Sequence, residues 1–185
     1  MTSLAALWLP IVLSAVFVFL LSSVIHMGPF WHRSDYPRVP NEDKVRDALR
    51  PLAIPPGDYM VPRPTSGAEM SSPEFLDKVK QGPVLMLTVM PNMMVPMGRN
   101  LALWFVYALV VSAVAACAAG ITLAPGTDEH DIFHVTALVT FMGYAAALWQ
   151  MSIWYRRSWS LTIKATVDGA LYALLTAGTF VWLWP

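Results

Sequence analysis

The sequence predicts a mainly α-helical membrane protein with four transmembrane helices and a small α+β cytoplasmic domain between the first and the second. Only 13% of its 185 residues are charged and 56% are hydrophobic, whereas a soluble domain carries roughly 25% charged residues. Four nearly uncharged runs are also long enough to cross a bilayer, which takes about 20 apolar residues in a helix. This composition excludes an ordinary cytosolic enzyme, a basic nucleic-acid-binding protein and a disordered tail.

Each of the four apolar runs ends where a helix or a span is expected to stop. Glycine or proline follows the first, second and fourth runs, and two arginines follow the third. These residues break a helix or stay in the aqueous phase. The first run lacks the basic start of a signal peptide, so we expect it to be a membrane helix. The expected helices cover residues 5–27, 101–124, 132–155 and 160–184.

The distribution of basic residues predicts the topology. Nine of the 12 lysines and arginines lie within residues 28–100. The other three, Arg156, Arg157 and Lys164, lie between the third and fourth runs. Lysine and arginine are enriched in cytoplasmic loops. We therefore expect residues 28–100 to be cytoplasmic and both termini to be periplasmic.

Residues 28–100 are the part of the chain expected to fold in water. Asn41 can cap a first helix, and Ser71 or Ser72 can begin a second helix that stops at Gly82. Residues 83–90 form an apolar strand with little polarity on either face, which must be covered or paired. About 70 residues with few large apolar side chains are marginal as an independent core. We therefore expect this segment to pack against the membrane helices or against another protein.

Five methionines lie close together within and just after this strand, and a thioether is a soft ligand suited to Cu(I). The alternative is packing, because methionine fills irregular contacts with a helix or a partner surface. The cluster contains no cysteine or histidine, which favours packing. Its members are Met86, Met90, Met93, Met94 and Met97.

Histidines supply the other candidate ligands. His130 and His134 are four residues apart and therefore share one helix face, as a metal-binding pair would. Imidazole also binds haem or pigment metals, so His134 and His26 are candidate cofactor ligands. The alternative for the pair is hydrogen bonding at the membrane surface. We expect no intrinsic cofactor, although lipid or pigment can bind at the helix faces.

Asp168 is the carboxylate placed within an apolar run, and an ionisable group inside a membrane is a functional hypothesis by default. Lys164 lies four residues earlier, so a structural ion pair between Lys164 and Asp168 is the favoured interpretation. A proton or ion path is the alternative. Transporters usually show polar groups or helix breaks at mid-membrane, whereas the middles of the four expected helices are apolar.

Small residues recur every four positions in the last two runs, as in Gly143 and Ala147 or Gly169 and Ala173. Such stripes let helices approach closely and carry no chemistry. Cys117 is the single cysteine, which excludes an intramolecular disulfide and a multi-cysteine zinc site. The catalytic triad, P-loop and dinucleotide-binding motifs are also absent from the sequence. We therefore expect no enzymatic activity.

Several strings resemble a family of small four-helix bacterial inner-membrane proteins, and the resemblance spans most of the chain from about Ser22 onward. It implies a location in the bacterial inner membrane, and it carries over no activity and no site residue. The strings are Asn41-Glu-Asp-Lys44, Asp47-Ala-Leu-Arg-Pro51, Ile54-Pro-Pro-Gly-Asp-Tyr-Met60 and Ser152-Ile-Trp-Tyr155 followed by Arg157-Ser-Trp159.

Together these features favour a non-catalytic accessory subunit of a larger integral-membrane complex, such as a photosynthetic reaction centre or a respiratory complex. Its expected partners are other membrane subunits and the lipid bilayer, not nucleic acid. The alternative is a small transporter or metal-handling protein that uses Asp168, His130 and His134, or the methionines over residues 86–97. The expected docking residues are Val84, Met86, Met90, Met93, Met94, Trp154, Arg156, Arg157 and Trp159.

Overall fold

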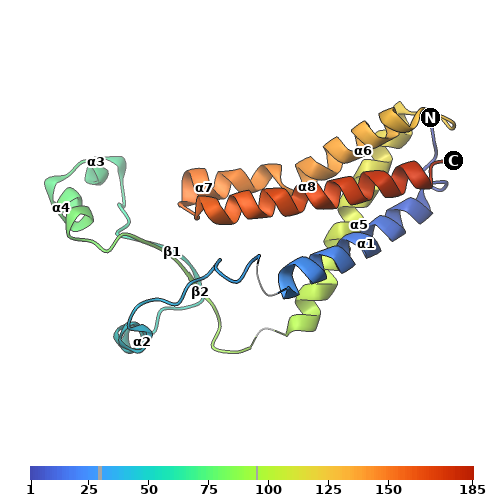
Figure 1. The fold of residues 1–185 in the computed structure, drawn as a ribbon. Helices are drawn as coiled ribbons and strands as arrows, with labels where there is room; N and C mark the ends of the chain where they lie inside the picture. Colours follow the sequence, from blue (N-terminus) through green and yellow to red (C-terminus); the bar gives the residue numbers. More distant parts are fainter. Residues whose placement is uncertain (29–30, 95) are drawn as a thin grey trace. The chain divides into compact units, whose positions relative to one another are not determined.

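The structure, a computed structural model, describes residues 1–28, 31–94 and 96–185. The chain divides into two compact units (Figure 1). Unit 1 combines Met1–Tyr36 with Pro96–Pro185, and unit 2 is Pro37–Val95.

Unit 1 is a helical bundle. Three of its segments are long and apolar enough to cross a membrane, namely Trp8–Met27, Met97–Thr122 and Glu129–Tyr155. The sequence predicts a fourth span over residues 160–184. The corresponding helix is 24 residues long, but it is not among the three segments that are apolar enough to cross a membrane. The helices of unit 1 are α1 (Trp8–Met27), α5 (Met97–Thr122), α6 (Glu129–Tyr144), α7 (Trp149–Tyr155) and α8 (Trp159–Trp182).

The third apolar segment is interrupted, although the sequence predicts one helix over residues 132–155. Helix α6 ends at Tyr144, and a 3₁₀ turn over Ala146–Leu148 leads into α7. Ala145 leaves the helical conformation, with φ −124° and ψ −42°. The hydroxyl of Tyr107 donates to the carbonyl oxygen of Gly143 at 2.6 Å, which supplies one of the donors that the last turn of a helix lacks.

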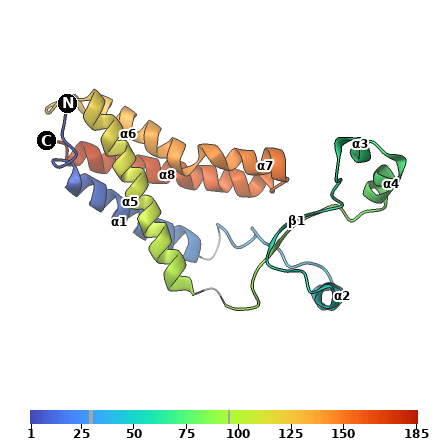
Figure 2. The ribbon, with the colours of Figure 1, turned by 180° about the vertical axis from the view of Figure 1, so that it is seen from behind.

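The core of unit 1 lies where α1, α5, α6 and α8 meet. Helix α8 runs along α6, and α1 packs against both α5 and α8 (Figures 1 and 2). Alanines at these contacts let the backbones approach closely. One buried apolar cluster contains Ala15, Val18, Ala108, Val111, Tyr144 and Tyr172. The other contains Leu7, Ala116, Ile132 and Phe180.

Buried hydroxyl groups make this interior more polar than the sequence predicts. Thr136 and Thr140 donate to carbonyl oxygens one turn earlier in their own helix, both at 2.6 Å. Other buried hydroxyls in the described part of the chain have no hydrogen-bond partner. These belong to Ser14, Ser112, Tyr144, Tyr172 and Thr176.

The two chain ends of unit 1 lie at the turn between α5 and α6 (Figure 1). The amide of Thr2 donates to the carbonyl oxygen of Gly120 at 2.8 Å. The amide of Gly126 donates to the carbonyl oxygen of Pro185 at 3.0 Å. Within unit 1, the end of α1, the start of α5 and the start of α8 lie at the opposite end of the bundle.

Unit 2 consists of short elements around a two-stranded antiparallel sheet, in which Tyr59 lies opposite Leu87. The side chain of Ser72 caps the second main helix by accepting from the amide of Phe75 at 3.1 Å, at the position where the sequence predicts a helix start. The apolar strand expected over residues 83–90 is present and has a partner. The elements are α2 (Glu42–Leu49), a 3₁₀ turn (Arg50–Leu52), β1 (Gly57–Val61), α3 (Gly67–Met70), α4 (Pro73–Gln81) and β2 (Leu85–Val89).

Unit 2 has almost no interior. Among its described residues, Phe75 is the only one that is buried. Apolar side chains on both strands are exposed, including Met60 and Met86. A two-stranded hairpin is marginally stable on its own in water.

Candidate functional site

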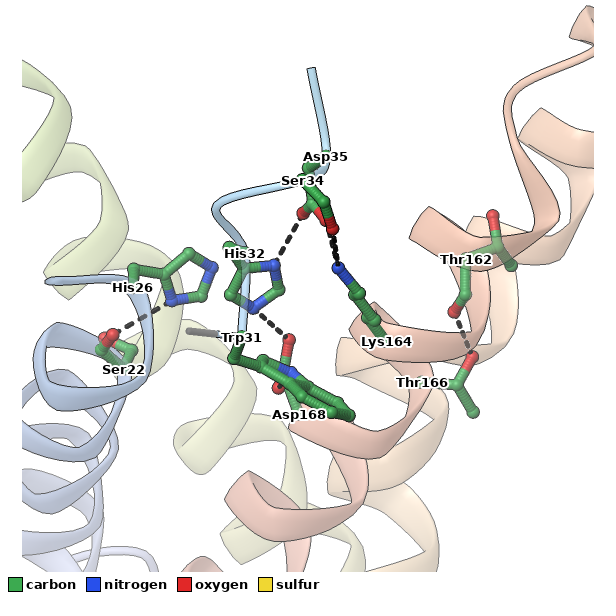
Figure 3. Close-up of polar contacts among 10 residues, drawn as sticks. All are labelled: Ser22, His26, Trp31, His32, Ser34, Asp35, Thr162, Lys164, Thr166 and Asp168. Carbon is green, nitrogen blue, oxygen red and sulfur yellow. Dashed lines mark hydrogen bonds and ion pairs between the residues drawn. The ribbon is translucent and has the colours of Figure 1, made fainter. Parts of the chain in front are cut away.

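A cluster of ionisable side chains lies at the end of unit 1 opposite the chain termini. It joins His26 from the last turn of α1, His32 from the following segment and Asp168 from α8 (Figure 3). One ring nitrogen of each histidine and one carboxylate oxygen all lie within 4.8 Å of one another. We call these three residues the His–Asp cluster.

Asp168 is the most deeply buried member, with 5% of its side chain exposed. Its Oδ1 accepts a hydrogen bond from the indole N–H of Trp31 at 2.9 Å. Its Oδ2 lies 3.0 Å from Nε2 of His32. A buried carboxylate needs such partners, because removing its charge from water is costly.

His32 lies between two carboxylates. Its Nδ1 is 2.6 Å from Oδ2 of Asp35. Its Nε2 is buried and close to Asp168, but the contact does not have hydrogen-bond geometry, so this nitrogen has no hydrogen-bond partner. The ring is therefore fixed by Asp35 and keeps one uncommitted nitrogen at the centre of the cluster.

Lys164 neutralises Asp35 behind His32. Its Nζ lies 2.7 Å from Oδ1 of Asp35 and 3.1 Å from the hydroxyl of Ser34 (Figure 3). Burial tends to raise the pKa of Asp35, but hydrogen bonds from Lys164 and His32 and the positive charge of Lys164 lower it below its ordinary value. The ammonium also lies 5.9 Å from the ring centre of Trp31, within reach of a cation–π contact.

His26 is exposed and stacks on His32, with ring centres 4.3 Å apart and planes 9° apart. Its Nδ1 is 2.9 Å from the carbonyl oxygen of Ser22. Because a carbonyl oxygen only accepts, Nδ1 carries the proton and Nε2 is left free. A surface depression lined by His26, Gly28, His32 and Arg33 opens beside the two rings.

The predicted ion pair between Lys164 and Asp168 is not formed, because each residue has another partner. Lys164 binds Asp35, and Asp168 contacts Trp31 and His32. Asp168 and His26 stand out in the sequence, whereas the loop residues Trp31, His32 and Asp35 do not. No fixed spacing marks them, since they reach α8 only through the conformation of the segment after α1.

The His130–His134 pair lies at the other end of unit 1, at the start of α6. Both rings are exposed, with centres 3.9 Å apart. His134 Nδ1 hydrogen-bonds the carbonyl oxygen of His130 at 2.7 Å. In the described residues, no third histidine, cysteine or carboxylate completes a ligand group with them. His26 and His134 are therefore separated along the bundle, and only His26 joins a cluster.

The methionines and the expected docking residues are mostly exposed. Met86 lies on β2, and Met97 begins α5. Arg157 is half-buried, and its amide donates to the carbonyl oxygen of Met151 at 3.1 Å. The exposed side chains are those of Val84, Met86, Met90, Met93, Met94, Met97, Trp154, Arg156 and Trp159.

No family model, curated protein or solved structure matches the chain.

Proposed function

We propose that the chain is a non-catalytic accessory subunit of a larger complex in a bacterial inner membrane. In this proposal unit 2 is cytoplasmic and contacts neighbouring subunits, while unit 1 is the membrane anchor. The observation that carries the proposal is the missing core of unit 2. Complexes of photosynthesis and respiration, the class expected from the sequence, are the first to test.

A four-pass anchor is supported by the position of the chain ends. Thr2 bonds to Gly120 in the last turn of α5, and Pro185 bonds to Gly126 in the α5–α6 turn, as expected of a chain that crosses the bundle an even number of times. With α1, α5 and the α6–α7 segment as three crossings, α8 supplies the fourth. Its polar residues are turned into the bundle, since Asp168 and Thr176 are buried, and this explains how a less apolar helix can lie in a bilayer.

Unit 2 supports the partner part of the proposal. A domain of about 60 residues is marginal even with a normal core, and unit 2 buries one side chain, Phe75, among its described residues. Met86 and Met90 are 43% and 67% exposed on or beside β2. Burying such side chains against a partner stabilises both surfaces, and methionine adapts to irregular ones.

The test is the mass and composition of the particle released from its native membrane by a mild detergent. We expect the 20.5 kDa chain to run in a much larger particle with other membrane subunits. Replacing Met86 and Met90 with serine should weaken that association. Met70→Ser is the matched control, because Met70 is also exposed in unit 2 but lies on α3. A lone protomer or a homodimer without other subunits would contradict the proposal.

A further inference from the structure

We infer that the His–Asp cluster binds one divalent transition-metal ion of the Zn²⁺ class, with His26, His32 and Asp168 as its protein ligands. This site is independent of the role proposed for unit 2. Two imidazoles and one carboxylate are a ligand set that such ions favour, with an open position left for water.

The two histidines are oriented as metal ligands are. Ligating histidines almost always donate their second ring N–H to a carbonyl oxygen or a carboxylate. His26 does so to the carbonyl of Ser22 at 2.9 Å, and His32 to Asp35 at 2.6 Å. In both rings Nδ1 is therefore committed, and Nε2 is the atom left to coordinate an ion.

Asp168 follows the same pattern. Trp31 donates to Oδ1, which fixes the carboxylate and leaves Oδ2 facing His32. The neighbouring lysine does not compete for this charge, because Lys164 is paired with Asp35. The cluster thus keeps one negative charge directed at the position between the two rings.

The uncommitted nitrogen of His32 is the second observation that points to a ligand. Nε2 is buried without a hydrogen-bond partner in the described residues, a state that costs free energy. An ion bound to Nε2 and to Oδ2 of Asp168 would satisfy both atoms.

The spacing suits one ion once the His26 ring turns out of its stack on His32. Ligands at about 2.0–2.1 Å from a tetrahedral ion lie about 3.3 Å from one another. His32 Nε2 and Asp168 Oδ2 are already 3.0 Å apart. His26 is exposed, so a side-chain rotation can complete the set. The depression beside His26 and His32 gives an ion access from the surface.

The test is titration of the metal-stripped full chain in detergent with Zn²⁺, and with Co²⁺ as an absorbing probe. We expect one Zn²⁺ per chain and Co²⁺ absorption bands typical of nitrogen and oxygen ligands. His32→Ala and His26→Gln should each lower the affinity at least 100-fold. Asp168→Asn removes the third ligand, but it also changes a buried carboxylate and can disturb the fold. His26→Gln keeps the fold, because His26 is exposed at a helix end.

His130→Ala and His134→Ala are the matched controls, because this pair is also exposed and histidine-rich but belongs to no ligand group among the described residues. Neither variant should change the affinity. Asp35→Asn retains the three ligands and removes the carboxylate behind His32, so it should weaken Zn²⁺ binding about 10–100-fold. The inference is overturned if the folded wild-type chain binds no stoichiometric Zn²⁺. It is also overturned if the ligand variants bind Zn²⁺ as tightly as the controls, because the cluster is then an ion-pair network alone.

Discussion

The hydroxyl groups of Tyr107 and Tyr172 differ in whether they have a hydrogen-bond partner. The hydroxyl of Tyr107 donates to the carbonyl of Gly143 at the end of α6, whereas the buried hydroxyl of Tyr172 has no partner in the described residues. We expect Tyr107→Phe to lower the free energy of unfolding by about 1 kcal/mol, because a carbonyl loses its donor. Tyr172→Phe should be neutral or stabilising. Thermal melting of both variants in one detergent measures the difference, and equal losses would contradict it.

Glu69 provides a pH-dependent contact in unit 2. Hydrogen bonds from the hydroxyl and the backbone N–H of Thr65 lower the pKa of Glu69 below its usual value. A lowered carboxyl pKa adds stability above the unfolded-state pKa, and that stability is lost as the pH falls through the folded-state pKa. Thr65→Ala should raise the pKa of Glu69 part of the way, because the backbone donor remains. A pH titration followed by NMR measures the pKa of Glu69 in wild type and in the variant. An unchanged pKa would contradict the role given to the Thr65 hydroxyl.

Residue pairing is where prediction from sequence fails most clearly. Lys164 and Asp168 are four residues apart on one helix, a spacing that predicts an ion pair between them. The segment after α1 brings Asp35 to Lys164 and Trp31 to Asp168 instead. Contacts of this kind depend on a loop conformation that no local pattern encodes.

At the scale of elements, α8 packs closely against the break between α6 and α7 at Gly169. A Cβ placed on Gly169 would lie 2.9 Å from the Cβ of Ala145 and 3.3 Å from that of Tyr144. We expect Gly169→Ala to lower the free energy of unfolding by about 1–3 kcal/mol, as overpacking does. Gly178→Ala is the control on the same helix, since its Cβ would meet nothing within 4 Å.

Melting midpoints of the two glycine variants separate packing from helix propensity. Alanine favours a helix over glycine by about 1 kcal/mol in water, so the Gly178 variant should be no less stable than wild type. A Gly169→Ala variant as stable as the control would mean that α8 does not approach the break this closely.

The elements themselves follow from local patterns far better than the pairings do. Apolar runs predict the long helices, and Ser71 or Ser72 predicts the start of α4, because a capping serine acts within three residues. No local pattern predicts the break at Ala145, which packs against Gly169 on another helix. Two members of the His–Asp cluster, His26 and Asp168, stand out in the sequence because they lie within apolar runs, but no pattern in the sequence joins them or includes His32.

At the scale of the whole molecule, the two units differ in how they are stabilised. Unit 1 has two buried apolar clusters, and unit 2 has one buried residue among those described. Local stability follows buried apolar contacts, and segments with few of them open readily. We therefore expect the amides of unit 2 to be less protected from hydrogen exchange than those of unit 1.

We expect β1 and β2 amides to exchange with solvent much faster than those of α5 in the isolated chain. Their hydrogen bonds join an exposed two-stranded sheet, whereas α5 contains buried residues such as Ala108 and Ala115. If the proposed complex forms through β2, its amides should become protected there, because the partner would cover the strand and remove water from its hydrogen bonds. Hydrogen exchange with mass-spectrometric detection of both samples measures this. Protection of β2 that is already complete in the isolated chain would show that unit 2 needs no partner.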